Sequence, residues 1–466
     1  MLRSLSLADV GPMDRLRVDL GPRLNVFAGD NGLGKSFVLD VVWWALTGTW
    51  AALPAWPRGT EGGTPEIAVD VDRAVAAAMS IPLDDGQVPD NVSIHGALAR
   101  LTTKFNFTTQ EWRILALSSA RSALPALVVS ARADGSFAVW DPARNHYMLR
   151  SAGMWGVSDT EAAGNPAVLR RPPAYVFTPD ALWNGLESHD KTLCNGLVRD
   201  WVSWQRQAPV GASTGAETEF GLLCRLLAAL SPHPDRPNEI LRPGPPVRVF
   251  VDDSRDFPTV DIGYGNVPVI HTSAAMRRIL GLAYLVVWSW REHIAASKLL
   301  RRPPASRIVF LMDEVENHLH PAWQRRIVPA LLSVFESLAP SMSVQAFMTT
   351  HAPLVLASLE PIFDVERDRL FVFDLDADNG NVTLDEVQWA TLGDATDWLT
   401  SPIFKLEQAR SVEAERVIED AEAFMRGDEP LQFKTRGELD IELHRVLSGD
   451  DVFWPRWIGA GEGPPP

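Results

Sequence analysis

Cysteine is almost absent from this sequence of 466 residues, which contains only Cys194 and Cys224. Two thiols without the close spacing of metal ligands exclude a disulfide framework and argue against a zinc site. Basic residues are in deficit as well, because 43 Lys and Arg stand against 59 Asp and Glu, a net charge of −16. That acidity argues against a surface that coats nucleic acid indiscriminately, although it leaves room for a local basic groove.

Long apolar runs and regular repeats are also missing. The N-terminal stretch lacks the apolar core of a signal peptide. The longest apolar run, residues 279–290, is shorter than the ~20 residues that span a bilayer. The sequence has no sustained heptad pattern, so we expect no coiled-coil arm. We therefore expect a cytoplasmic protein without membrane contact.

What the sequence does contain is the composition of an ordinary globular protein, with 46% hydrophobic and 22% charged residues. A stretch rich in Pro and Gly at 53–67 breaks the first helical segment. The apolar periodicity predicts the following elements in chain order: strands and a helix within 1–50, a hairpin within 125–145, a helix at 219–231, a helix over 273–297, a strand over 308–312, a long helix from Pro321, a strand over 343–350, a strand pair within 370–384, and charged helices over 395–450.

A glycine-rich loop near the N-terminus carries the first chemical motif. The string GDNGLGKS, residues 29–36, follows an apolar strand and precedes an apolar helix, which disfavours a coincidental turn. Glycines let backbone N–H groups turn toward phosphate oxygens, and the positive end of the following helix points at them. We expect Lys35 to reach the β- and γ-phosphates and Ser36 to bind Mg²⁺. The residues expected to hold ATP are Gly29, Asp30, Asn31, Gly32, Leu33, Gly34, Lys35 and Ser36.

A second motif closes a strongly apolar strand. Residues 308–312 lead directly into Asp313 and Glu314. A buried strand that ends in two carboxylates is typical of a Walker B site, which is weak as a signal alone and strong beside a phosphate loop. Asp313 is then expected to hold Mg²⁺, and Glu314 to position or deprotonate the attacking water.

A histidine follows the next apolar strand. Residues 343–350 are expected to form a buried strand, which places His351 at the rim of the sheet. A lone histidine after a strand is more often structural than catalytic. His351, however, comes one helix after the strand that ends at Asp313. A residue that senses the γ-phosphate is expected at this place. Neutral imidazole can accept from the attacking water or donate to the phosphate.

Taken together and in this order, the three motifs resemble ABC-type ATPases, in particular the soluble branch that includes the SMC, RecF and OLD proteins. The string DEVENHLHPAWQRRIVPALL, residues 313–332, resembles a run found in stand-alone bacterial ATPases, many of them encoded in antiphage-defence or toxin-like operons. The resemblance covers about residues 1–50 and 265–375. It implies an α/β fold, namely an ABC-ATPase head whose P-loop core sheet is flanked by helices, with an inserted mixed α/β subdomain and a helical C-terminal tail.

The resemblance also implies a division of the chain. The expected parts are an N-terminal lobe with the phosphate loop at 1–50, an inserted mixed region at 51–265, a C-terminal lobe at 266–390 and a charged helical tail at 391–466.

ABC ATPases act as head-to-tail dimers, in which a signature helix of one copy closes over the nucleotide of the other. Ser273, at the start of an expected helix before the Walker B strand, occupies the place of the signature serine. Ala274 and Ala275 stand where the family usually has at least one glycine, which implies slow or conditional hydrolysis. Arg277 and Arg278 follow, either as a structural pair or as contacts to the nucleotide in trans.

Other residues leave two readings open. Gln110 is either the glutamine that in this family links Mg²⁺ to the helical subdomain or a surface glutamine. Asn317, His318 and His320 fit a loop that stacks against the partner subunit better than a metal site, because no third ligand is evident. Asp374, Asp376 and Asp378 fit a hairpin with an Asn-Gly turn better than the metal site of a nuclease domain.

The resemblance implies an ATP hydrolase that uses ATP and Mg²⁺ as a homodimer or higher homo-oligomer. Its nucleotide-driven dimerisation would sense a trigger and regulate a separate effector, a nuclease or toxin, in antiphage defence. The alternative is a RecF-like clamp that binds DNA in an ATP-dependent way, and the acidic charge counts against it. The motor subunit of a membrane transporter is less favoured, because such proteins carry a fuller Ser-Gly-Gly-Gln signature.

Overall fold

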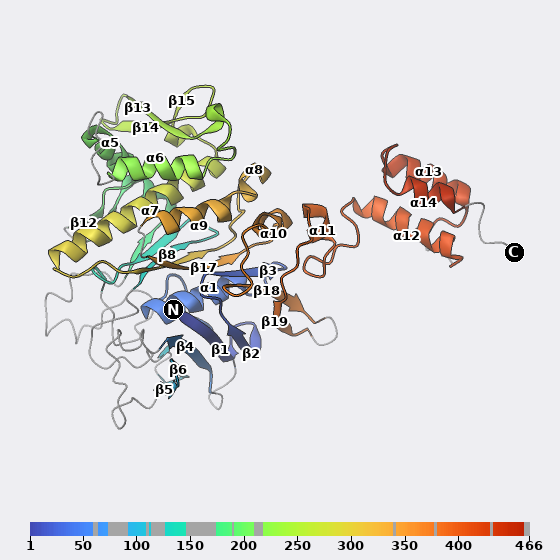
Figure 1. Cartoon of the computed structure of the whole chain (residues 1–466), viewed down its shortest axis with the longest axis horizontal. Coiled ribbons are helices and arrows are strands. Elements are labelled where there is room, and N and C mark those ends of the chain that lie inside the picture. Colours follow the sequence, from blue (N-terminus) through green and yellow to red (C-terminus); the bar gives the residue numbers. More distant parts are fainter. Residues whose placement is uncertain are drawn as a thin grey trace. The chain divides into compact units, whose positions relative to one another are not determined.

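The computed structural model divides the chain into two compact units, Met1–Thr391 and Leu392–Pro466 (Figure 1). No helix among the described residues has the length and apolar content needed to cross a membrane. The structure describes residues 1–58, 64–72, 92–108, 111–112, 126–145, 174–188, 191–208, 218–338, 342–376, 380–428 and 432–460.

An eight-stranded sheet forms the centre of the first unit, in the order β10-β9-β8-β16-β17-β3-β18-β19. The five inner strands, from β8 to β18, are parallel to one another, and the outer ones pair antiparallel. Inner strands are apolar along their whole length because helices cover both faces of a parallel sheet. The strands are β3 (Leu24–Gly29), β8 (Leu127–Ala131), β9 (Phe137–Trp140), β10 (Tyr175–Phe177), β16 (Arg307–Met312), β17 (Ser343–Thr349), β18 (Asp368–Leu375) and β19 (Val382–Val387).

A second, antiparallel sheet lies next to the first and has the order β2-β1-β4-β6-β5. Along β2 the buried and exposed residues nearly alternate, as expected when one face of a sheet packs on a core. The strands are β1 (Leu2–Val10), β2 (Met13–Asp19), β4 (Glu66–Asp72), β5 (Val92–His95) and β6 (Leu98–Asn106), with β7 (Glu111–Trp112) paired to β6.

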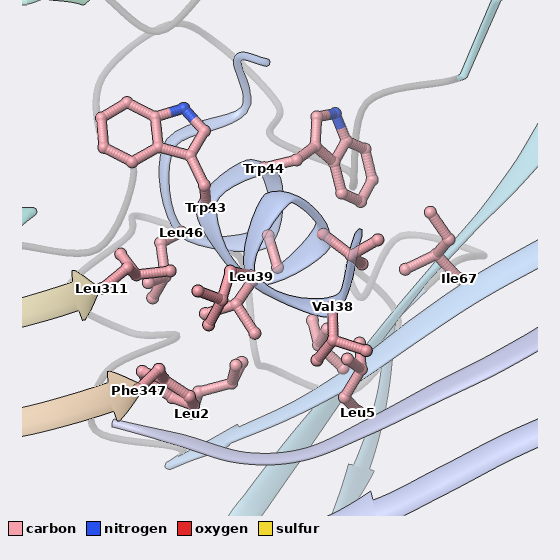
Figure 2. Close-up of a cluster of buried hydrophobic side chains, with 14 of the residues drawn as sticks. Leu2, Leu5, Val38, Leu39, Trp43, Trp44, Leu46, Ile67, Leu311 and Phe347 are labelled. Atoms are coloured by element: carbon pink, nitrogen blue, oxygen red, sulfur yellow. The ribbon is translucent and has the colours of Figure 1, made fainter. Parts of the chain in front are cut away.

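The helix that follows the phosphate loop, α1 (Lys35–Thr47), packs between the two sheets. Figure 2 shows Val38, Leu39 and Trp43 of α1 among Leu5 of the antiparallel sheet and Phe347 of the central sheet. Ten of the thirteen residues of α1 are buried. This burial fixes α1 between the two sheets, and the phosphate loop leads directly into it.

Helices α7 and α9 cover the opposite face of the central sheet, with α5 and α6 packed on them (Figure 1). The expected helix over 273–297 is confirmed as α7, and the expected hairpins within 125–145 and 370–384 are confirmed as β8–β9 and β18–β19. The remaining elements of this unit are α4 (Pro179–Asn184), β11 (Leu186–Ser188), β12 (Lys191–Cys194), α5 (Leu197–Gln207), α6 (Glu219–Ala229), η2 (Pro237–Glu239), β13 (Arg242–Arg248), β14 (Asp256–Asp261), β15 (Asn266–Pro268), η3 (Val269–His271), α7 (Ala274–Leu299), α8 (Pro321–Gln324), α9 (Ile327–Leu338) and α10 (Pro353–Leu359).

Two expectations differ from the structure. The expectation of one long helix from Pro321 is wrong, because the segment divides into α8 and α9. Pro329 explains the break: its ring would clash with the carbonyl of Arg325 in a continuous helix, whereas the first turn of a new helix tolerates it. The region 51–265 is not a separate insertion, since β4–β6 complete the antiparallel sheet and β8–β10 form one side of the central sheet.

The second unit is helical, as expected for the tail. It comprises α11 (Ala395–Leu399), α12 (Val412–Arg426), α13 (Arg436–Val446) and α14 (Trp454–Gly459). Residues of α12, α13 and α14 form a hydrophobic core of their own, centred on Ile418, Leu443 and Trp457. Thr435 and Glu438 form a capping box at the start of α13. This unit therefore has the core and caps of an independent small domain.

Candidate functional site

The phosphate loop runs from the end of β3 to the start of α1, and two of its glycines are required by the backbone. Gly29 has φ 121°, and a Cβ there would lie 2.3 Å from the carbonyl oxygen of Phe373. Gly34 has φ 108°, and a Cβ there would lie 2.6 Å from Cγ of Pro12. Both positions therefore exclude any side chain, which lets the loop pass close to its neighbours.

Lys35 is buried at the first position of α1, and its ammonium group is held by the loop itself. Nζ donates to the carbonyl oxygens of Gly29, at 2.8 Å, and of Asp30, at 2.6 Å. Burial lowers the pKa of Lys35 to about 8, against the opposing effect of Asp30 and Glu314. The cation thus lies over the loop with backbone partners that an anionic phosphate can replace.

Asp313 follows β16 and meets the phosphate loop across the sheet. Its Oδ1 accepts from the Ser36 hydroxyl at 2.9 Å and from the Thr349 hydroxyl at 2.7 Å. The same Thr349 oxygen accepts from the backbone N–H of Glu314 at 2.7 Å. Ser36 and Asp313 are 277 residues apart in the sequence, and the parallel strands bring them into contact.

The pair formed by Ser36 and Asp313 suits a magnesium ion. Mg²⁺ prefers oxygen ligands and is usually held by one or two carboxylates, with waters and substrate phosphates completing its shell. Among the described residues no group of three or more His, Cys, Asp or Glu side chains is placed to hold a metal. The hydroxyl of Ser36 and the carboxylate of Asp313 fit an ion whose remaining ligands come from the nucleotide and from water.

Glu314 and His351 lie together beside that pair. His351 Nε2 is 4.0 Å from Oε1 of Glu314, and both side chains are partly exposed. Glu314 has φ 45°, a left-handed conformation that is uncommon for a residue with a side chain. This left-handed residue follows Asp313 directly, just after β16 ends at Met312.

Glu316 holds the end of β17, a role that the sequence reasoning did not assign. Its carboxylate accepts from the backbone N–H of His351 at 2.5 Å and from the Thr350 hydroxyl at 2.8 Å. The Asp-Glu-x-Glu spacing shows that Glu316 stands two residues after Glu314, but its contact with the end of β17 depends on which strands become neighbours. Glu316 therefore positions His351 relative to Glu314.

Arg277 and Arg278, whose roles the sequence left open, have different environments in the structure. Arg278 Nη2 donates to the carbonyl oxygens of Asp313 and Glu314, each at 3.0 Å, and burial lowers its pKa. Arg277 is exposed and lines a pocket of about 190 Å³ together with Trp183 and His318. Arg278 thus links the start of α7 to the acidic strand end within one chain.

Ser273 is the N-cap of α7 and faces solvent. Its hydroxyl oxygen accepts from the backbone N–H of Met276 at 3.3 Å. None of the hydrogen bonds among the described residues links Ser273 to the loop 29–36 of its own chain. Exposure leaves its hydroxyl proton free for a partner outside this chain.

A protein-family comparison covers the acidic half of this site. Residues 294–357 match the family model described as "AAA domain, putative AbiEii toxin, Type IV TA system". That segment carries Asp313, which bonds Ser36 of the phosphate loop, and the neighbouring pair Glu314 and His351. The match covers this segment alone, and together with the phosphate loop it indicates a P-loop ATPase.

The ATPase is also similar to individual proteins. It is 36% identical over 52 residues to the "Retron Ec83 probable ATPase" of Escherichia coli, a match that spans 11% of this chain and only 8% of the relative. The "SMC head domain from Thermotoga maritima" is 11% identical, with a TM-score of 0.36, over 83% of this chain and 99% of that one. The recombination mediator protein RecF is 12% identical, with a TM-score of 0.33, over 80% of this chain and 95% of that one. Both TM-scores are low, so nothing about ligands or partners follows from these two structures.

The remaining sequence candidates of the ATPase have structural positions. Asn317 Nδ2 donates to the carbonyl oxygen of Ala133 at 2.9 Å, and His320 Nδ1 accepts from the backbone N–H of Ala322 at 3.2 Å as the N-cap of α8. Asp374 lies in β18, and Asp376 follows it in the turn toward β19. Gln110 and Asp378 lie outside the described residues.

Both cysteines are free, and burial raises the pKa of Cys194 to about 12. At neutral pH this thiol stays protonated, so it has little nucleophilic character.

Proposed function

We propose that this ATPase hydrolyses ATP with Mg²⁺ in a dimer of two copies, and that the cycle of dimer formation senses a trigger and regulates a separate effector in bacterial antiphage defence. The hydrogen-bond chain from Ser36 through Asp313 and Thr349 to Glu314 carries the proposal. It joins the phosphate loop to the acidic strand end, so nucleotide binding and the hydrolytic group are part of one structure.

Within one copy, each side chain has a separate task. The loop 29–36 and the Lys35 ammonium hold the triphosphate, while Ser36 and Asp313 supply oxygen ligands to Mg²⁺. A bound ion would stabilise the negative charge that develops on the phosphate oxygens during transfer. Glu314 orients the attacking water and accepts its proton. His351, held by Glu316, donates a hydrogen bond to the γ-phosphate or accepts one from the water.

The second copy completes the site through Ser273. Because its oxygen already accepts from Met276, the hydroxyl proton is free to donate to a phosphate oxygen of the partner's nucleotide. The N-terminal end of α7 adds the favourable partial positive charge of a long helix. Ala274 and Ala275 replace the glycines that would let the backbone come closest, which supports slow or conditional turnover.

The effector is proposed to be a separate protein, a nuclease or toxin. The helical unit Leu392–Pro466, with its own core and charged helices, offers a docking domain for it. The likeness to a retron ATPase supports antiphage defence as the process. A RecF-like DNA clamp is the competing function, and the net charge of −16 counts against it. DNA binding that requires ATP and weakens steeply with salt would favour the clamp.

The test is steady-state ATP turnover by the purified protein and by Glu314→Gln. Removal of the general base is expected to lower turnover by about 10²- to 10⁴-fold while the Kd for ATP stays unchanged. Glu336→Gln, at an exposed position of α9, is the matched control and should behave as wild type. Equal turnover of Glu314→Gln and wild type would contradict the catalytic assignment.

A further inference from the structure

The segment after α1 is fixed to the turn between β1 and β2 by backbone hydrogen bonds. The carbonyl oxygen of Trp56 accepts from the N–H of Gly11 at 3.0 Å, and the N–H of Arg58 donates to the carbonyl oxygen of Asp9 at 2.7 Å. The indole N–H of Trp112 donates to the carbonyl oxygen of the residue before Trp56 at 2.8 Å. The backbone on both sides of Trp56 is therefore held in place.

The same turn touches the phosphate loop. Pro12 packs against Gly34, since a Cβ at Gly34 would lie 2.6 Å from its ring. Gly11 packs against the ring of Phe37 in the first turn of α1, where a Cβ would lie 2.4 Å from that ring. Arg58 strengthens this arrangement, because Nη1 donates to the carbonyl oxygen of Pro12 at 2.9 Å and also pairs with Asp14 at 2.9 Å. The segment that carries Trp56 thus adjoins the edge of the phosphate loop.

Trp56 nevertheless exposes 77% of its surface. Among the described residues no other tryptophan is as exposed, and Trp43, Trp112 and Trp201 are almost completely buried. An exposed indole on a fixed backbone loses little conformational freedom when a flat ligand stacks on it. The exposure and the anchoring together indicate a surface for a planar group.

We propose that Trp56 stacks on the base of the nucleotide whose phosphates lie in the loop 29–36. The inference rests on the proposed nucleotide binding and adds the residue that recognises the base. A nucleoside is the part of ATP that extends beyond the phosphate loop, and the turn at Pro12 borders that loop. Stacking accepts any base but grows with ring area, so Trp56 favours purine over pyrimidine nucleotides. Arg58 is the positioning residue, because it ties the segment to the turn.

Leu53 in the same segment is 73% exposed, which gives a matched control. If the segment were instead a docking surface for another protein, Leu53 and Trp56 would act alike and neither would affect nucleotide affinity. If Trp56 stacks on the base, only Trp56 affects it.

The experiment measures the Kd of the full-length protein for Mg·ATP, Mg·CTP and inorganic tripolyphosphate, which has the phosphates without the base. Trp56→Ala is expected to weaken ATP binding by about tenfold or more and to leave tripolyphosphate binding unchanged. Trp56→Phe should retain most of the ATP affinity, Leu53→Ala should match wild type, and wild type should prefer ATP to CTP.

Equal losses for ATP and tripolyphosphate in Trp56→Ala would overturn the inference, since they would indicate a distorted loop. Unchanged ATP affinity in Trp56→Ala would overturn it too. A wild-type protein that binds neither ligand would instead contradict the proposed function itself, and the two failures are therefore distinguishable.

Discussion

The loop 29–36 and the acidic strand end around Asp313 are two parts of one site, and they are built in different ways. The loop is made by neighbours in the chain, and between β3 and α1 the carbonyl oxygens of Gly29 and Asp30 accept from Lys35. The acidic end is assembled from three places: Asp313 after β16, Thr349 at the end of β17, and Arg278 in α7. Local backbone geometry holds the first part, and side-chain hydrogen bonds over long sequence separations hold the second.

This difference predicts a division of labour. Damage to the loop should abolish nucleotide binding, because the phosphates have no other partners of that strength. Damage to the acidic end should spare binding and reduce turnover, because in the proposed mechanism the hydroxyls and carboxylates there act on the water and the metal ion. Variants at matched positions in the two parts therefore test this division of labour.

The largest effect is expected from Lys35→Ala. The ammonium makes charge-assisted hydrogen bonds that no other loop residue replaces, so ATP affinity should fall by at least about 100-fold. Isothermal titration with Mg·ATP measures the loss. Lys298→Ala, at an exposed lysine near the end of α7, should bind as wild type does. Wild-type affinity in Lys35→Ala would mean that the loop does not hold the triphosphate.

A pair of glycine variants tests whether backbone geometry alone sets the loop. Gly29→Ala places a Cβ 2.3 Å from a carbonyl oxygen of β18, whereas a Cβ at Gly32 meets nothing within 4 Å, although φ is 80° there. We expect Gly29→Ala to lower the free energy of unfolding by more than about 2 kcal/mol, and Gly32→Ala by about 1 kcal/mol. Urea denaturation measures both, and equal losses would contradict the packing described for Gly29.

Thr349→Val tests the acidic end. The substitution removes the hydroxyl between Asp313 and the backbone N–H of Glu314, which costs about 1–3 kcal/mol where the groups are buried. Turnover should fall by about tenfold, with ATP affinity within about twofold of wild type. Thr350→Val, which loses its bond to Glu316 instead, should have a smaller effect. Lost ATP binding in Thr349→Val would erase the distinction between the two parts.

The smallest effect is a pH dependence that belongs to the loop alone. Burial lowers the pKa of Lys35 to about 8 in the free protein, and the triphosphate binds the protonated form. Affinity should therefore be constant below that pKa and fall as the pH rises through it, to roughly tenfold weaker near pH 9 than near pH 7. Lys35→Arg keeps its charge over this range, so a profile as steep as that of wild type would rule out Lys35 as the titrating group.

The sequence predicted the loop and the strands around it because both are local signals. Residues 29–36 carry their chemistry in consecutive letters, and the apolar runs before Asp313 and His351 end where the structure ends β16 and β17. The roles of Arg278 and Glu316 could not be read in this way. Each depends on which strands become neighbours, and single-sequence periodicity does not specify strand order.

The same reason explains the region 51–265. Its strands are short and separated by breaks rich in Pro and Gly, so each resembles a local hairpin in sequence. Their pairing with β1 and β16 is a long-range event that only the assembled sheets decide. The break between α8 and α9 was readable in principle, because Pro329 marks it.

The contacts of Arg278 have a further consequence for the proposed dimer. Arg278 follows Ser273 by five residues, and its guanidinium donates to the carbonyl oxygens of Asp313 and Glu314 in the same chain. In the proposed dimer, Ser273 contacts the nucleotide of the partner, while Asp313 and Glu314 serve the nucleotide of their own copy. A shift of α7 on one nucleotide is then transmitted to the hydrolytic residues at the other. The two sites are expected to be cooperative, so that nucleotide bound at one site changes the rate of hydrolysis at the other.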